Sequence, residues 1–453
     1  MSGICIETAG LRDSGYRWLG AIPAHWTTAE IRRIADIRLG KMLQTAPTSP
    51  EDVEMPYVSA INVQPEGLSV EPKKSMWFSR AEQQELTIEP GDVLVVEGGS
   101  VGRSVYLADG LEGWRFQNSI NRVRSKPALS VGAFVDYALR HLQSEGVIDM
   151  VCNKATIMHL TAEKLGRLRI ALPSVNEQER IVSYLDQETA EIDDFIADQE
   201  ELIGLLDERR AATITQAVTK GLDPTVTMKD SGSLWLGRVP EQWDAAPLKR
   251  YASVLDCKHI TAEFSDAGEY PLASIQQVQS KFVDLSEAKR TTDAYYRLLI
   301  DGDRKPRTND LIFSRNATVG QVAQVGHEQP EFAMGQDVCL IRGSDGAVVV
   351  EYLHYALRSS ATQNQLESLM VGSTFRRINV GQIKTLLMAF PDVETQRSIV
   401  QYLDFEISEI DSAIEDAKKA IELSKERRAA LISAAVTGKI DVRKQITAEL
   451  GAA

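Results

Sequence analysis

Residues 178–219 read QERIVSYLDQETAEIDDFIADQEELIGLLDERRAATITQAVT, and residues 396–437 read QRSIVQYLDFEISEIDSAIEDAKKAIELSKERRAALISAAVT. The two stretches match at an offset of 218 and are identical at 23 of 42 positions. Neither contains a proline. In both, apolar residues recur in alternating steps of four and three, which is typical of a long helix that packs along a second helix. The repeat therefore predicts two similar long helices in one chain.

We expect these helices to pair with each other as an antiparallel coiled coil. An alternative is that each is a separate amphipathic helix packed on its own domain. Asn176 and Glu179 are interpreted as a capping box at the first helix start, and Gly221 and Gly438 as the stops. About 40 residues at a rise of 1.5 Å give rods of roughly 60 Å. The predicted seam comprises Ile181, Leu185, Ile192, Phe195, Leu202 and Leu206 in the first helix and Ile399, Leu403, Ile410, Ala413 and Ala417 in the second.

A second repeat lies upstream of each predicted helix. Residues 13–26 (DSGYRWLGAIPAHW) match residues 230–243 (DSGSLWLGRVPEQW) at 8 of 14 positions, at an offset of 217. Solenoid repeats are about 20–50 residues long, so a period near 218 indicates a duplicated half-protein instead. Two similar halves in one chain suggest a target that also has two halves. The tryptophans could stack on bases, but their identical surroundings in both halves favour a packing role.

The net charge of −14 is unevenly distributed along the chain. Residues 171–222 carry 4 basic and 12 acidic side chains, whereas residues 1–170 carry 19 and 20 and residues 223–388 carry 18 and 20. Acidic helices repel phosphate and favour solvent or a protein partner, while the nearly neutral segments could each hold a basic patch. No apolar run is long enough to span a bilayer and no signal-peptide pattern is found, so we expect a cytoplasmic protein without a membrane segment. The four dispersed cysteines are interpreted as reduced thiols.

The segments 1–170 and 223–388 read as α/β domains with many short strands. The turn and buried strand at residues 91–96 have a counterpart at residues 309–313, and each strand leads into a loop, at residues 97–103 and 314–320. Between such anchors the halves diverge, and residues 40–90 barely resemble residues 257–308. The frame is thus duplicated while the presented surfaces differ, as expected for two readers of two different sequences.

The ordered motifs resemble the specificity subunit of type I restriction–modification systems. The resemblance rests on Trp-Leu-Gly-x-[Ile/Val]-Pro-x-x-Trp, on Pro-x-x-x-x-Gln-x-x-Ile-x-x-Tyr-Leu at Pro173 and Pro391, and on Glu-Arg-Arg at the helix ends. It covers nearly the whole chain, in order and twice. It implies an α/β fold with two target recognition domains separated by two long antiparallel helices that form a coiled coil, in a pseudo-two-fold internal repeat. The expected divisions are recognition domain 1 (1–172), first spacer helix (173–222), recognition domain 2 (223–390), second spacer helix (391–440) and C-terminal tail (441–453).

The resemblance also implies function and partners. The chain would be a non-catalytic subunit of an adenine-N6 DNA methyltransferase and type I restriction endonuclease complex. It would recognise a bipartite site in double-stranded DNA and position two methyltransferase subunits, with two motor–nuclease subunits joining for cleavage. S-adenosylmethionine, ATP and magnesium are expected on those partners, so we expect no cofactor on this chain. The alternative is a duplicated coiled-coil scaffold without sequence-specific DNA binding.

Motifs for catalysis are missing from the sequence. There is no Asn/Asp-Pro-Pro-aromatic motif for a flipped adenine and no Gly-x4-Gly-Lys-Ser/Thr phosphate loop. A nuclease could use Asp92 and Glu97, but no Glu-x-Lys follows, and the other half has Asp310 with Ser314. The six histidines form no ligand pair, so we expect no metal site and no catalytic residue.

DNA contacts need basic and small polar side chains for phosphate, and Arg, Lys, Asn or Gln for base edges. We place phosphate contacts on the duplicated loops and base reading in the diverged parts. The candidate DNA-binding residues are Ser100, Arg103, Asn118, Lys154 and Thr156 in the first half and Arg315, Thr318, Ser373, Thr374, Arg376 and Arg377 in the second.

Overall fold

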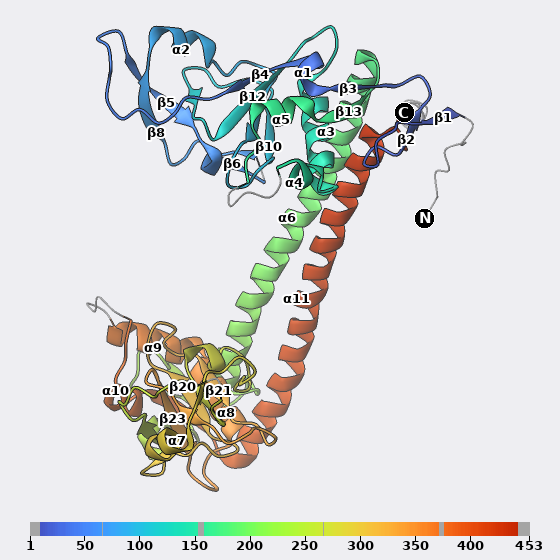
Figure 1. Ribbon diagram of the computed structural model, residues 1–453. Helices are drawn as coiled ribbons and strands as arrows, with labels where there is room; N and C mark the ends of the chain where they lie inside the picture. The colour runs from blue at the N-terminus through green and yellow to red at the C-terminus, as the bar shows by residue number, and fades with distance from the viewer. Residues whose placement is uncertain (1–9, 66, 153–157, 266, 371–375, 443–453) are drawn as a thin grey trace. The chain divides into compact units, whose positions relative to one another are not determined.

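The computed structural model describes residues 10–65, 67–152, 158–265, 267–370 and 376–442. The chain divides into two compact units, the first made of residues 1–199 and 419–453 and the second of residues 200–418. Each long helix contributes one part to each unit, and each unit is described by itself (Figure 1). No helix among the described residues is long and apolar enough to cross a membrane.

Unit 1 is built around a four-stranded antiparallel sheet of order β10-β9-β12-β4. A second sheet, β11-β5-β8, pairs β11 with β5 in parallel, and the pairs β13–β3, β1–β2 and β6–β7 complete the unit. The strands are β1 Leu11–Asp13, β2 Ala21–Pro23, β3 Thr27–Glu30, β4 Ala35–Leu39, β5 Val53–Val58, β6 Val63–Gln64, β7 Gly67–Leu68, β8 Lys74–Phe78, β9 Asp92–Val96, β10 Ser104–Leu107, β11 Arg115–Phe116, β12 Ile120–Ser125 and β13 Arg169–Leu172. The helices are α1 Ile31–Ile34, η2 Ala60–Asn62, α2 Arg80–Glu85, α3 Gly132–Ser144, α4 Val147–Cys152, α5 Ala162–Arg167 and α6 Val175–Lys220, of which residues up to 199 belong to this unit.

Unit 2 repeats this plan, with the sheets β21-β20-β23-β17 and β22-β18-β19 and the pairs β24–β16 and β14–β15. Its strands are β14 Met228–Asp230, β15 Arg238–Pro240, β16 Asp244–Pro247, β17 Ala252–Asp256, β18 Tyr270–Ala273, β19 Arg290–Thr291, β20 Leu311–Ser314, β21 Val322–Gln324, β22 Ala333–Met334, β23 Val338–Gly343 and β24 Leu387–Phe390. Its helices are η3 Leu248–Arg250, η4 Ile275–Val278, α7 Asp293–Ile300, α8 Val350–Arg358, α9 Ser360–Met370, α10 Val380–Lys384 and α11 Val393–Val436, of which residues up to 418 belong to this unit.

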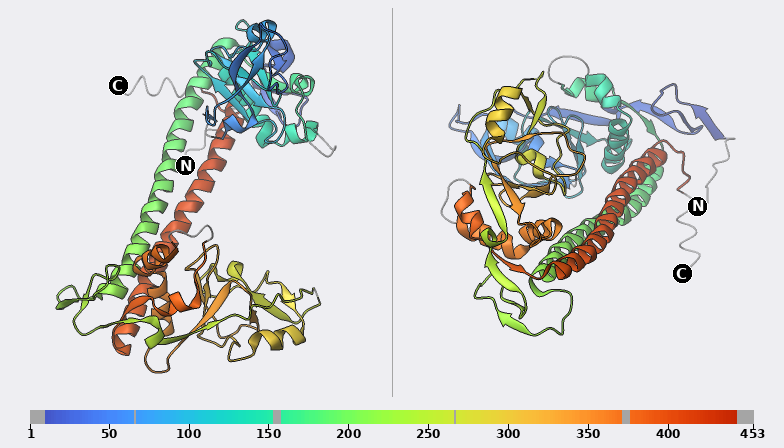
Figure 2. Two further views of the ribbon diagram at one scale, coloured as in Figure 1. Left: turned by 90° about the vertical axis from the view of Figure 1, so that its left-hand side faces the viewer. Right: turned by 90° about the horizontal axis from the view of Figure 1, so that it is seen from below.

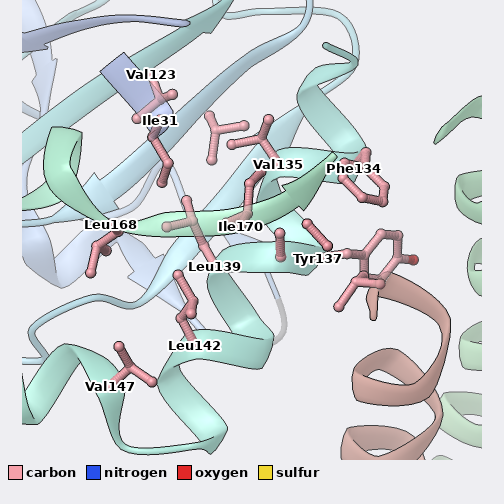
Figure 3. Close-up of a cluster of buried hydrophobic side chains, with 14 of the residues drawn as sticks. Ile31, Val123, Phe134, Val135, Tyr137, Leu139, Leu142, Val147, Leu168 and Ile170 are labelled. Carbon is pink, nitrogen blue, oxygen red and sulfur yellow. The ribbon is translucent and has the colours of Figure 1, made fainter. Parts of the chain in front are cut away.

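The core of unit 1 forms where α3 packs against the four-stranded sheet. Phe134, Val135 and Leu139 on α3 are fully buried with Val123 of β12 and Ile170 of β13 (Figure 3). The same cluster takes in residues of both long helices, namely Ile181, Leu185, Ile432, Ala435 and Val436. Unit 2 has the equivalent cluster, which includes Ile214, Ala217, Val218, Ile399 and Leu403.

In each unit, one part of α6 lies beside one part of α11, and the views of the ribbon agree on this arrangement (Figures 1 and 2). In unit 1 the start of α6 packs with the end of α11, and in unit 2 the end of α6 packs with the start of α11, so the two helices are antiparallel. This confirms the predicted fold class, an α/β fold with an internal repeat and two long antiparallel helices.

The buried face of α6 differs in part from the predicted seam. Ile192 is 5% exposed, but Phe195 and Leu202 are 43% and 41% exposed, and Ala413 on α11 is exposed as well. These three assignments are wrong, because a repeat of 3.5 residues permits a step of three or of four at each turn. The buried and partly buried positions include Thr189, Ile192, Ile196, Gln199, Ile203 and Leu206 on α6 and Ile407, Ile410, Ile414, Ala417 and Ile421 on α11.

The helix start also differs from the expectation. The Glu177 carboxylate accepts hydrogen bonds from the backbone N–H and the hydroxyl of Ser174, and the backbone N–H of Glu177 donates to that hydroxyl. The capping box is therefore formed by Ser174 and Glu177, and the prediction of Asn176 and Glu179 is wrong. Gly221 and Gly438 follow the helix ends with φ of 79° and 71°, a left-handed conformation that favours glycine.

Candidate nucleic-acid interface

The duplicated loops lie at one end of the four-stranded sheet in each unit. In unit 1, the loop after β9 meets the segment before α5, where the N–H of Leu160 donates to the carbonyl of Glu97 at 2.8 Å. In unit 2, the N–H of Ile378 donates to the carbonyl of Arg315 at 3.0 Å. Isolated bridges repeat the same geometry, with Gly98 paired to His159 and Asn316 to Arg377. Segments that are distant in sequence are therefore brought together in the same way in each unit.

In each unit a third segment, which lies just before the central strand β12 or β23, meets these two segments. The N–H of Glu97 donates to the carbonyl of Ser119 at 2.8 Å, and the N–H of Arg315 donates to that of Asp337 at 2.9 Å. In unit 1, the N–H of Asn118 also donates to the carbonyl of Lys41, so the loop after β4 is included. We call each convergence of loops at this sheet end the strand-end cluster of its unit.

Several of the candidate DNA-binding residues lie in the strand-end clusters. Ser100 is exposed, Arg103 is half-buried and donates to the carbonyl of Val63 at 3.2 Å, and Asn118 is half-buried. In unit 2, Thr318, Arg376 and Arg377 are exposed. Lys154, Thr156, Ser373 and Thr374 lie outside the described residues.

Arg315 departs from its predicted role as a phosphate contact. Its side chain is 3% exposed and lies 3.0 Å from the Asp256 carboxylate. One of its nitrogens also donates to the backbone carbonyl of Gln336 at 3.3 Å and lies 3.6 Å from the Cys257 sulfur. A buried guanidinium with a carboxylate partner is not free to meet a phosphate, so Arg315 orders the loop that precedes β23.

The same arginine bears on metal binding. Among the described residues, Asp256, Cys257 and His259 form one cluster with metal-ligand chemistry. The Arg315 guanidinium already supplies the positive charge beside Asp256 and Cys257. Burial raises the pKa of the Cys257 thiol to about 11, so a metal ion here would have to displace the thiol proton and would lie beside the guanidinium charge. These donors therefore fit a cation poorly.

The carboxylates considered for a nuclease do not form one site. Asp92 begins β9 and is fully buried, where Arg124 donates two hydrogen bonds to it at 2.8 Å. Glu97 follows the other end of this five-residue strand, roughly 17 Å away at 3.3–3.4 Å per residue, and contacts His159 at 2.9 Å. The Arg124–Asp92 pair recurs as Arg342 with Asp310, also buried, which indicates a structural role.

Both strand-end clusters border a cavity. In unit 1 a cavity of about 620 Å³ is lined by Ser100, Arg103 and Arg140 together with Lys425 and Arg428 of α11. In unit 2 a cavity of about 410 Å³ is lined by Thr261, Phe264, Gln276, Lys289 and Gln336. Gln276 and Gln336 line the unit 2 cavity but were not among the candidate DNA-binding residues predicted from the sequence. The sequence could have indicated Gln336 as a candidate, because it corresponds to the candidate Asn118 at the repeat offset of 218.

Comparisons with known proteins agree with this architecture. The family model for the type I restriction modification DNA specificity domain matches twice, at residues 23–203 and 240–423. A type I restriction enzyme specificity subunit of Methanocaldococcus jannaschii, MjaVIII, is 21% identical over 431 residues, which cover 93% of this chain and 94% of the relative. The EcoKI specificity subunit of Escherichia coli K12 is 21% identical over 214 residues, which cover 45% and 44%.

Solved structures show the same fold. A chain from a structure of a type I restriction–modification system aligns with a TM-score of 0.70 at 15% identity, covering 92% of this chain and 99% of the other. The HsdS subunit of Thermoanaerobacter tengcongensis aligns with a TM-score of 0.52 at 14% identity, covering 92% and 98%. Because the family model matches most of the sequence in two copies, the chain belongs to the family of type I restriction–modification specificity subunits.

Proposed function

We propose that this chain is the non-catalytic subunit that reads a bipartite DNA site for a methyltransferase complex. The observation that carries the proposal is the repetition of one strand-end cluster on two matching frames whose exposed side chains differ. Such a pair of surfaces suits two different half-sites. Polar and basic groups on these loops, such as Ser100, Arg103, Thr318 and Arg376, would contact phosphates, which position a protein without reading sequence.

The test is a map of modified adenines after the chain is produced together with its methyltransferase partner. We expect one bipartite motif, with a fixed gap between its halves. DNA binding without any sequence preference would contradict the proposal and favour a scaffold that only joins proteins. The isolated chain is expected neither to bind S-adenosylmethionine nor to methylate DNA, so methyl transfer by the chain alone would also contradict it.

We further propose that two methyltransferase subunits dock on the long helices, and that two motor–nuclease subunits join the complex for cleavage. Leu205 in unit 2 and Leu423 in unit 1 are 55% and 65% exposed and stand at equivalent positions. Exposed leucines on otherwise acidic helices suit a protein partner better than DNA. S-adenosylmethionine would bind the methyltransferase, and ATP with magnesium would bind the motor.

Charge substitutions at these leucines test the docking. We expect Leu205→Glu and Leu423→Glu each to reduce the mass of the complex by one methyltransferase subunit, measured by native mass spectrometry. Glu191→Gln, at an exposed position on α6, serves as a control that changes surface charge without removing an apolar contact. Retention of both subunits by the double leucine variant would place the docking surface elsewhere.

A further inference from the structure

Asn118 and Gln336 occupy the same position in the two units. Each stands two positions before the central strand, β12 or β23, and they correspond at the repeat offset of 218. Their neighbours differ, since Gln117 and Ser119 in unit 1 correspond to Gly335 and Asp337 in unit 2. A carboxamide is thus present at the same place in both strand-end clusters, although the residues on either side of it have diverged.

The backbone at this position is fixed in both units. The N–H of Asn118 donates to the carbonyl of Lys41 at 2.8 Å. The carbonyl of Gln336 accepts from the Cys257 thiol at 3.1 Å and from Arg315 at 3.3 Å. Arg315 therefore acts as a positioning residue for Gln336. This role accounts for the burial of Arg315 in a loop that was expected to face DNA.

Both carboxamides keep hydrogen-bonding groups free. Gln336 is exposed, and its side-chain nitrogen donates one hydrogen bond to the Thr261 hydroxyl at 3.0 Å. This bond orients the amide while leaving its oxygen and its second N–H available. The Asn118 side chain makes no hydrogen bond within the part of the chain that the structure describes, and it is half-exposed. Each unit thus presents one donor and one acceptor on a single planar group.

The surroundings of Gln336 suit the edge of a base pair. The unit 2 cavity that it lines also contains the apolar ring of Phe264, whose face is covered by the Lys289 ammonium at 4.7 Å. In unit 1, the exposed Met42 follows Lys41, the backbone partner of Asn118. A carboxamide and an apolar side chain that line one cavity, as in unit 2, would match the mixed polar and methyl-bearing edge of an A·T pair in the major groove.

We propose that Asn118 and Gln336 each read an adenine, one in each half-site of the target. A carboxamide can donate to N7 and accept from the N6 amino group of adenine in one plane, a pairing that no other base offers in the major groove. This inference rests on the proposed function, because it presupposes that the two units face two DNA half-sites. It assigns the same chemistry to both units, while their diverged neighbours would read the remaining bases.

The experiment uses the full chain with its methyltransferase partner and a library of randomised duplexes. We expect Gln336→Ala to lower the preference for adenine about tenfold at one position of the half-site read by unit 2, leaving the other positions unchanged. Asn118→Ala should do the same in the other half-site. Gln336→Glu has nearly the same shape but only acceptors, so it should lose adenine and gain cytosine, whose N4 amino group donates. Gln242→Ala, at an exposed glutamine between β15 and β16, is the control and should change nothing.

Other outcomes separate the two levels of the proposal. A uniform loss of affinity for every sequence in the variants would assign these amides to phosphate and overturn the base-reading role. Unchanged preferences in Gln336→Glu and Asn118→Ala would overturn it too. Gln336→Glu and Gln336→Asn supply the answer if Gln336→Ala fails to fold. A wild-type complex with no sequence preference would instead refute the proposed function itself.

Discussion

The hydroxyl of Tyr137 on α3 donates a hydrogen bond of 2.7 Å to the carboxylate of Asp186 on α6, and the hydroxyl of Tyr355 on α8 donates one of the same length to Asp404 on α11. In each unit this bond fastens the recognition domain to a long helix. Burial, together with the neighbouring carboxylate, raises the pKa of both tyrosines, so they remain neutral donors over the whole working pH range.

We expect Tyr137→Phe to destabilise unit 1 by about 1 kcal/mol, since it removes one partner of a partly buried hydrogen bond and keeps the ring. Tyr355→Phe should cost unit 2 less, because Asp404 retains the Lys281 ammonium at 2.8 Å. Hydrogen exchange of α3 and α8 measures the two units separately. If the backbone amides of α3 exchanged equally slowly in Tyr137→Phe and in the native chain, the hydrogen bond would not hold α3 to α6.

The register of the coiled coil can be tested with two neighbouring apolar residues. Ile192→Ala should destabilise unit 1 by about 2–4 kcal/mol, because it leaves a cavity at a position that is 5% exposed. Phe195→Ala should cost less, about 1 kcal/mol, because that residue is 43% exposed. Denaturant midpoints of the two variants give the comparison. A larger loss in Phe195→Ala would restore the seam predicted from the sequence.

Acid stability should depend on Glu177. Burial opposes ionisation of this carboxyl, but hydrogen bonds from His25, Ser174 and Trp26 outweigh burial and lower its pKa to about 2. A carboxyl with a lowered folded pKa stabilises the fold above its unfolded pKa of about 4.3, and this stability is lost as pH falls toward 2. Glu177→Gln should therefore flatten the dependence of stability on pH between about 5 and 2. Glu179→Gln, at an exposed position on the same helix, should retain the native profile.

Each recognition domain should keep its own half-specificity when it is transplanted. Replacing residues 1–170 by the same region of a relative should alter only one half of the recognised motif, because the repeated flanks supply an interchangeable frame. Mapping of modified adenines measures the result. A change in both halves at once would argue that the domains read the site jointly.

The long helices are predicted to set the gap between the half-sites. Four residues added to one helix lengthen it by roughly 6 Å and turn the domain beyond it by about 40°. At 3.4 Å per base pair, the preferred gap should widen by one or two base pairs while the bases read stay the same. An active complex with an unchanged gap would show that the helices do not control spacing.

The repeats predicted the helix pair well because the two helices are duplicated along their whole length with the order of their motifs intact. The seam register was less predictable. Identical isoleucines at 196 and 414, and at 203 and 421, marked the buried face, but alternating steps of four and three fit the neighbouring positions equally well.

The candidate site was predictable only where residues are duplicated. The loops after β9 and β20 could be found from their matching order, whereas the burial of Arg315 depends on Asp256 and Cys257, which are distant in sequence. Those two residues have no acidic or thiol counterpart in the first half, where Leu39 and Gly40 stand at an offset of 217. Because these distant residues determine the burial of Arg315, the sequence around Arg315 gives no indication that it is buried.

Unit 1 contains both the earliest and the latest described parts of the chain, whereas unit 2 is one continuous stretch. Pro23 and Trp26 lie against Gly438, and Val442 is buried in the same core as Ile22. During synthesis on the ribosome, residues 200–418 can therefore fold as soon as they emerge. The first recognition domain must wait for the end of α11, which is made after the whole of unit 2, before its core is closed. A truncated product that lacks the end of α11 would thus carry a finished second reader and an unfinished first one.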